Sequence, residues 1–203
     1  SNTESGWVAT ETLAGSRIRT DFKDVPNQIE TLTKDFMQDL GLTSLDQALI
    51  YSANVENAAD YVPTQAGSLV ADPGISGRVR GISSGTLTRN FFKISTPTDN
   101  FNIERATIAS GPNAILFGLG SPAGILDATP ARALMRNRYG FELSYDSENS
   151  KRCTFDANVM VVPQKLTLRL MGLSRREYTE KMPNLDRDER LYGALTAKPF
   201  KST

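Results

Sequence analysis

Polar and apolar residues alternate along the C-terminal third of the chain. Apolar side chains occupy every second position in four segments separated by turns, at residues 139–146, 153–161, 166–171 and 191–197. Segments of this kind are typical of transmembrane barrel strands, whose apolar side chains face lipid and whose polar side chains face the lumen. A soluble antiparallel sheet with one buried face gives the same alternation and is the commoner structure, so periodicity alone leaves both open.

Short strands and helices are mixed in the first part of the chain. Residues 28–32 predict a strand, and Thr33 can cap a helix over residues 34–40 that ends at Gly41. Residues 44–47, Ser-Leu-Asp-Gln, form a capping box that opens a second short helix. We therefore expect two amphipathic helices directly after a strand.

Further strands are predicted toward the middle of the chain. Residues 75–82 alternate weakly, and residues 101–109 read as a strand with Phe101 and Ile103 on one side and Ile108 on the other. Residues 54–77 lack a clear period and predict a long loop. Together with the first strand, these segments predict a small mixed sheet in an α+β fold.

A glycine-rich run over residues 104–127 is the most informative stretch of the sequence. Its turn-formers and glycines surround a short apolar core, Ala114 to Phe117, with Ile125 beyond. This combination favours a buried strand, a tight turn and close backbone approach. The pattern disfavours a dinucleotide-binding loop, because the third glycine comes one position late and Pro122 stands where a helix would begin.

Composition removes several classes of function. The 203 residues carry equal numbers of acidic and basic side chains, so no broad basic field is present to bind nucleic acid. There is no histidine and only one cysteine, Cys153, which excludes an internal disulfide, a Cys/His zinc site and a Ser-His-Asp triad within this sequence. No apolar run approaches the roughly 20 residues of a membrane helix. We predict neither a metal, a cofactor nor an enzymatic activity.

The glycine-rich run resembles the plug domain of TonB-dependent outer-membrane receptors. The matching residues are Glu104-Arg105, Gly111-Pro112, Leu116-Phe117-Gly118 and the segment from Ser121 to Asp127. Residues 12–55 resemble the start of such a plug, and residues from 139 onward resemble the first barrel strands. The polar start of the chain indicates a tag or linker at 1–6, and the resemblance implies a plug domain at 7–132 and a partial barrel at 133–203. Its structural motif would comprise Gly81, Gly111, Pro112, Gly118, Gly120 and Gly124.

The resemblance also implies a function. A plug of this kind gates energy-coupled uptake through a complete barrel in the cell outer membrane, with TonB as partner and a scarce small-molecule or oligomeric nutrient as substrate. Arg80, Glu104 and Arg105 are candidates for ion pairs that hold plug to barrel, since Ser110 replaces the basic residue common before Gly-Pro. Asp127 stands where the family usually has asparagine.

Polar residues in or beside the long loops are candidates for contact with the substrate. They are Tyr61, Asp72, Thr88 and Asn90. Receptors for siderophores, cobalamin, saccharides and peptides share the plug pattern, so the resemblance does not choose among these substrates.

The number of strands raises a physical difficulty. A plugged barrel has about 22 strands, whereas this sequence has room for three or four, and an open sheet edge cannot lie in lipid. The chain is then either a fragment of a receptor or a truncated relative whose strands fold back as an ordinary sheet. The second case predicts a soluble α+β protein, dimeric through its open edge. Its function would be that of a soluble periplasmic or secreted ligand-binding module without transport.

Overall fold

The chain separates into two compact units, Ser1–Pro130 and Ala131–Thr203. The computed structural model describes residues 7, 11–12, 20–21, 29–53, 55–57, 77–79, 86–94, 96, 98–110, 124–145, 149–178 and 185–198. None of the helices in these ranges is long and apolar enough to cross a membrane.

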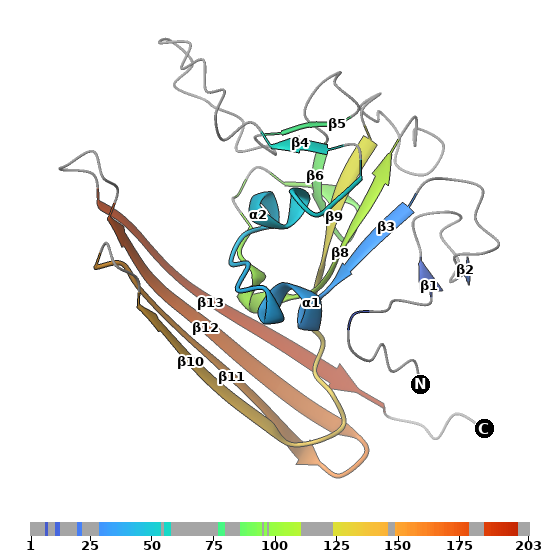
Figure 1. Ribbon diagram of the computed structural model, residues 1–203. Coiled ribbons are helices and arrows are strands. Elements are labelled where there is room, and N and C mark those ends of the chain that lie inside the picture. Colours follow the sequence, from blue (N-terminus) through green and yellow to red (C-terminus); the bar gives the residue numbers. More distant parts are fainter. Residues whose placement is uncertain are drawn as a thin grey trace. The chain divides into compact units, whose positions relative to one another are not determined.

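The first unit is built on a five-stranded mixed sheet (Figure 1). Its strand order is β3-β8-β9-β6-β7, in which β6 and β9 run parallel and the other neighbours run antiparallel. The predicted α+β fold with a small mixed sheet is therefore confirmed. The strands are β3 (Ile29–Thr33), β6 (Thr86–Arg89), β7 (Phe92–Lys93), β8 (Ile103–Ser110) and β9 (Gly124–Pro130), with the 3-10 turn η3 (Asn100–Asn102) before β8.

The two predicted helices form at the predicted places. The Thr33 hydroxyl accepts a hydrogen bond from the Phe36 amide at 3.2 Å and caps α1 (Lys34–Asp39), after which Gly41 turns the chain with a φ of 66°. Ser44 and Gln47 complete the capping box of α2 (Leu45–Leu49). These ends are set by local side-chain bonds to the backbone, which is why the sequence locates them well.

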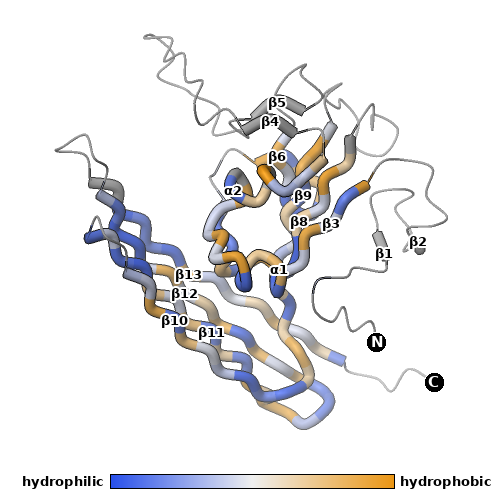
Figure 2. The backbone as a smooth tube through the Cα atoms, viewed as in Figure 1, coloured by the Kyte–Doolittle hydropathy of each residue, from blue (hydrophilic) through white to orange (hydrophobic). Residues whose placement is uncertain are grey.

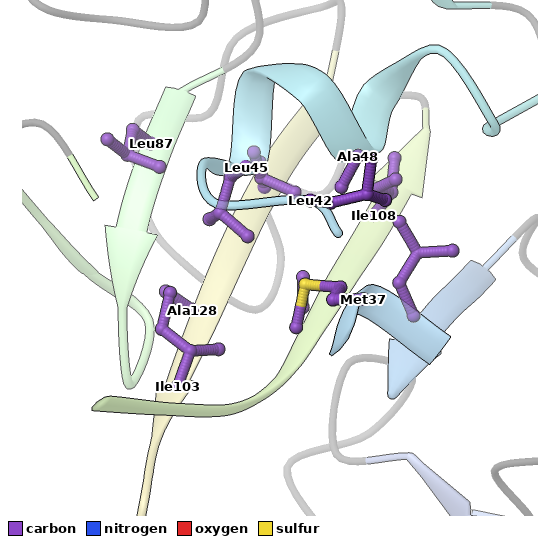
Figure 3. Packing of buried hydrophobic residues seen from close by; sticks show 11 residues of the cluster. Met37, Leu42, Leu45, Ala48, Leu87, Ile103, Ile108 and Ala128 are labelled. Carbon is purple, nitrogen blue, oxygen red and sulfur yellow. The ribbon is translucent and has the colours of Figure 1, made fainter. Parts of the chain in front are cut away.

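Both helices pack on one face of the sheet and build the main hydrophobic core (Figures 1 and 3). Met37 of α1 is fully buried, and Leu45 of α2 is 2% exposed. Burying a side chain of this size contributes about 1.5–3 kcal/mol relative to leaving it in water. The core residues are Leu32, Met37, Leu42, Leu45, Ala48, Leu87, Ile103, Ala106, Ile108, Leu126 and Ala128.

One prediction about β8 is wrong. Ile103 and Ile108 were expected on opposite sides of the strand, but both belong to the same buried core. The pairing of β8 with β9 shifts by one residue between Ile103 and Arg105, so Glu104 is the extra residue of a β-bulge. The bulge turns Ile103 toward the core and leaves the Glu104 side chain half-buried.

The predicted loop over residues 54–77 is interrupted by strands at its two ends. β4 (Val55–Asn57) pairs antiparallel with β5 (Gly77–Val79), where the weak alternation of residues 75–82 predicted a strand. Two further short strands, β1 (Glu11–Thr12) and β2 (Thr20–Asp21), pair antiparallel with each other.

The second unit is a four-stranded antiparallel sheet in which each strand pairs with the next in the chain (Figure 1). Its strands are longer than the predicted segments: β10 (Arg138–Tyr145), β11 (Lys151–Val162), β12 (Leu166–Tyr178) and β13 (Leu185–Ala197). Their lengths of 8, 12, 13 and 13 residues suit strands that cross an apolar layer at a tilt. Hydrophobic and hydrophilic residues alternate along them (Figure 2).

Candidate functional site

The apolar face of the second unit is uncovered. The pairing of the strands places Phe141, Phe155, Gly172 and Leu191 opposite one another in one row across the sheet. Every second residue from this row along each strand lies on the same face. Phe141 is 68% exposed and Leu191 is 76% exposed. Large exposed side chains on this face also include Tyr139, Leu143, Tyr145, Val159, Leu170 and Leu195. Such a continuous apolar surface indicates contact with a membrane or with another protein.

The opposite face carries mostly polar side chains beside the buried Met171 and Leu173, and several of the polar ones are deeply buried. Asn158 and Thr167 are fully buried, and Arg169 is 4% exposed. A soluble sheet buries its apolar side and leaves its polar side to water. In this sheet the apolar side is exposed and the polar side is buried. A barrel wall has this arrangement, with lipid outside and polar contacts inside.

Segment 131–137, which leads into β10, is fastened to the polar face of the sheet. The Asn158 side chain accepts a hydrogen bond from the Leu134 amide at 2.9 Å and donates to the carbonyls of Leu134, at 2.8 Å, and Arg136. Tyr192 donates from its hydroxyl to the Ala131 carbonyl at 2.9 Å. These bonds satisfy backbone groups that would otherwise be costly to bury.

A bidentate ion pair completes this attachment. Arg169 donates through Nε and Nη2 to the two carboxylate oxygens of Asp156, at 2.8 and 2.6 Å, and through Nη1 to the Arg132 carbonyl at 2.8 Å. One guanidinium therefore joins strands β11 and β12 to segment 131–137. Because the arginine is buried, its positive charge depends on this carboxylate for compensation.

A second cluster of polar contacts lies in the first unit, around Asp127 of β9. This carboxylate is 1% exposed and accepts hydrogen bonds from the Thr88 hydroxyl at 2.7 Å and the Phe91 amide at 2.6 Å. Asn90 and Phe91 form the two-residue turn between β6 and β7, with φ angles of 50° and 67°. A bulky residue such as phenylalanine rarely adopts positive φ, so the bond from its amide to Asp127 helps to hold the turn.

Burial raises the pKa of Asp127 above its ordinary value of 3.8. Loss of hydration is the largest cause, and the Phe91 amide, the Thr88 and Thr129 hydroxyls and the charge of Arg105 oppose it by lowering the pKa. The folded protein therefore holds this proton more tightly than the unfolded chain does. The contribution of this group to stability is greatest at low pH and falls as pH rises from about 3.8 through the raised pKa.

Asp127→Asn is expected to stabilise the first unit relative to the wild type, by an amount that grows as pH rises above about 3.8. The amide keeps an oxygen acceptor for the turn and carries no charge to bury. Asp127→Leu is the matched variant: it leaves the Phe91 amide without this acceptor and costs about 1–3 kcal/mol. Urea unfolding followed by the fluorescence of Trp7, which packs against Phe36 of α1, measures both. A difference between wild type and Asp127→Asn that shrinks with rising pH would contradict the assignment.

The structure locates three of the residues singled out from the sequence. Glu104 lies at the bulge of β8, and Arg105 follows it, opposite Thr33 and Thr129 of the neighbouring strands. Gly124 begins β9 with a φ of 111°, a conformation that side chains with a Cβ rarely adopt. Arg80, Gly81, Gly111, Pro112, Gly118 and Gly120 lie outside the described residues.

Two of the candidate substrate contacts are also located. Thr88 lies within β6, is 3% exposed, and donates its hydroxyl to Asp127. Asn90 is exposed at the tip of the adjacent turn. Tyr61 and Asp72 lie outside the described residues, and contact of all four with a substrate stays a prediction.

Sequence reasoning did not identify the contacts that fasten segment 131–137. The residues that make these contacts, Asn158, Arg169 and Tyr192, lie at positions where the alternating pattern predicts a side chain on the polar face. Nothing in the pattern distinguishes them from the other side chains of that face. Their partners are backbone groups more than 20 residues away in the chain, which no local pattern reveals. Asn158 and Arg169 point to these contacts only when the register of the strands is known. The described residues contain no cluster of His, Cys, Asp or Glu suited to a metal ion.

Comparison with known proteins agrees with this arrangement. The chain is 22% identical over 197 residues to the ferrioxamine receptor of Yersinia enterocolitica, covering 92% of this chain and 26% of that protein. It is 24% identical over 217 residues to the ferrichrome outer membrane transporter/phage receptor of Escherichia coli K12, covering 98% of this chain and 28% of that protein. The chain thus spans about a quarter of the curated relatives. No family model matches it.

Solved structures show the same fold. The alcaligin outer membrane receptor of Bordetella pertussis superposes with a TM-score of 0.79 at 17% identity, over 98% of this chain and 34% of that one. The ferripyoverdine receptor of the outer membrane of Pseudomonas aeruginosa superposes with a TM-score of 0.82 at 15% identity, over 98% of this chain and 27% of that one. The resemblance to TonB-dependent outer-membrane receptors is confirmed, with a fold that matches plug and barrel strands.

Proposed function

We propose that this chain is the plug and the first barrel strands of an outer-membrane transporter that takes up an iron-siderophore complex with energy supplied through TonB. The observation that carries the proposal is the reversed burial of the second unit, whose large apolar side chains are exposed while polar side chains of the opposite face are buried. This pattern fits a sheet in contact with lipid on one side.

The relatives supply the class of substrate. The two curated relatives are named for ferrioxamine and ferrichrome, and the two solved structures described above are receptors for alcaligin and ferripyoverdine. Iron bound to a siderophore is therefore the substrate class we propose. Relatives that are receptors and transporters also favour a function without catalysis.

The roles of the predicted residues belong to the same proposal. We assign residues 7–132 to the plug and 133–203 to the barrel, with residues 1–6 as a tag or linker. Arg80, Glu104 and Arg105 would pair plug with barrel, and the long loops of the plug would contact the substrate. The relatives give no support to the predicted homodimer.

The alternative function, a soluble ligand-binding module, is not favoured. It requires the strands of the second unit to bury their apolar residues against the protein. Phe141, Leu143 and Leu191 are each exposed by more than two thirds, at 68%, 71% and 76%. Leaving such side chains in water forfeits about 1.5–3 kcal/mol for each.

Uptake of radioactive iron tests the proposed function. The complete gene that encodes this chain is expressed in a Gram-negative strain without its own ferrioxamine and ferrichrome receptors, and iron is supplied in either siderophore. We expect iron to accumulate with at least one of them, and accumulation to disappear in a matched strain without TonB. Failure of the purified protein to bind either complex, together with no uptake while the protein is present in the outer membrane, would overturn the proposal.

A further inference from the structure

Segment 131–137 is held to the sheet of the second unit mainly through its own backbone. The side chains that hold it are Asn158 of β11, Arg169 of β12 and Tyr192 of β13, which form hydrogen bonds with backbone groups of residues 131, 132, 134 and 136. Because these side chains come from three different strands, the segment is fastened across the width of the sheet and not to one strand alone.

Two more contacts lie in the second half of the segment. The Thr167 hydroxyl donates to the Met135 sulfur at 3.1 Å, and the Asn137 side-chain oxygen accepts a hydrogen bond from the Met160 amide at 2.8 Å. The contacts therefore extend from residue 131 to residue 137. A pull on one end of the segment is shared among all of them.

The segment begins where the five-stranded sheet of the first unit ends. Strand β9 ends at Pro130, and the next residue, Ala131, already binds Tyr192. Among the five strands, β3 is the first along the chain and lies at an edge of the sheet, whereas β9 is the last and lies between β8 and β6. A pull on the N-terminal end of the chain therefore reaches β3 first and β9 last.

The segment ends where the proposed barrel wall begins. Strand β10 starts at Arg138, directly after the segment, and the first register pair of β10 with β11 joins Arg138 to Asn158. Asn158 thus holds the segment through its side chain and stands opposite the first residue of β10. A force that passed beyond the segment would act on this first pair of the sheet.

We propose that segment 131–137 is a mechanical stop for the unravelling of the plug. When energy supplied through TonB pulls on the N-terminal side of the plug, unravelling ends at Pro130 and the segment stays fastened to the barrel wall. The stop protects the pairing of β10 with β11. It also keeps the C-terminal end of the plug close to its folded position, which shortens the loop that refolding must close. The inference rests on the proposed function, because the force comes from the partner proposed there.

Single-molecule pulling on the full-length protein tests the inference. The protein is inserted into a lipid bilayer and pulled through a handle at its N-terminus, and the greatest unfolded length reached before the barrel strands unfold is measured. One variant carries a flexible insert of about ten glycine and serine residues between residues 130 and 131, which adds about 36 Å when it is extended. A matched variant carries the same insert between residues 137 and 138. We expect the first insert to lengthen the unfolded chain by its full extent and the second to add nothing, because it lies beyond the stop.

A variant with a weakened stop tests which contacts are responsible. Asn158→Ala combined with Tyr192→Phe removes four hydrogen bonds to the segment. In this background the insert between residues 137 and 138 is expected to add about 36 Å as well. Thr154→Ala is the control, since Thr154 lies four residues away on the same face of β11 and stands opposite Glu142 and Leu173. Circular dichroism verifies that each variant keeps its strands.

The result that overturns the inference is equal lengthening by the two inserts, lengthening by neither, or a second insert that still adds nothing when the stop is weakened. The pulling measurement uses no substrate. A failure of iron uptake that leaves the difference between the inserts intact would therefore place the error in the proposed transport and not in the stop.

Discussion

Phe141→Lys is expected to destabilise the membrane-inserted protein by about 2–4 kcal/mol, because it places a charge near the middle of the lipid-facing band. Phe141 is 68% exposed, and it shares a cross-strand row with Gly172, which lies near the middle of β12. Urea titration of the full-length protein folded into phospholipid vesicles measures the change. The soluble alternative predicts the opposite, since a lysine on a water-exposed surface costs almost nothing.

Gly140→Lys is the matched control for this prediction. Gly140 is the residue before Phe141 in β10 and is exposed on the opposite, polar face, where a Cβ would meet only the Asp156 Cβ, at an ordinary contact distance of 3.7 Å. A lysine at this position is expected to cost less than about 1 kcal/mol. Equal effects of the two lysines would contradict the assignment of one face to lipid.

Arg169→Met is expected to destabilise the second unit by about 3–5 kcal/mol, because it leaves the Asp156 carboxylate without its partner in a mostly buried site. The same change also removes the bond to the Arg132 carbonyl, so the attachment of segment 131–137 weakens. Urea titration measures the loss of stability, and hydrogen exchange at the amides of residues 131–137 measures the loosening of the segment.

Two further variants separate burial from charge in this prediction. Arg187→Met breaks a pair of the same chemistry and similar distance, but with both side chains more than half exposed, and is expected to cost less than about 1 kcal/mol. Arg169→Met combined with Asp156→Leu removes both charges and is expected to recover most of the stability. A double variant as unstable as Arg169→Met would show that the ion pair is not the cause.

Local features of this chain were predictable because their physical cause lies within a few residues. The Thr33 cap, the Ser44 capping box and the turn at Gly41 each depend on bonds or dihedral angles within one helical turn. The alternation from residue 139 onward likewise predicted strands, although β12 and β13 extend well beyond the segments that the pattern marked.

Features that depend on register were not predictable. The bulge at Glu104 reverses the side on which Ile103 lies, and a one-residue shift of this kind has no signature in the sequence. The turn at Asn90 and Phe91 takes positive φ without glycine, because Asp127 from a distant strand binds its backbone. In both cases a partner strand determines the local structure.

The sequence by itself determined that the second unit consists of strands with one apolar and one polar face, because the period of two is a property of the backbone. Only the tertiary structure decided which face is covered. Water and lipid produce the same alternation, since either arrangement separates apolar from polar side chains. Asn158 and Arg169 bind segment 131–137 on the polar face, while Phe141 and Leu191 stay exposed on the other, and that difference in burial distinguishes a membrane wall from a soluble sheet.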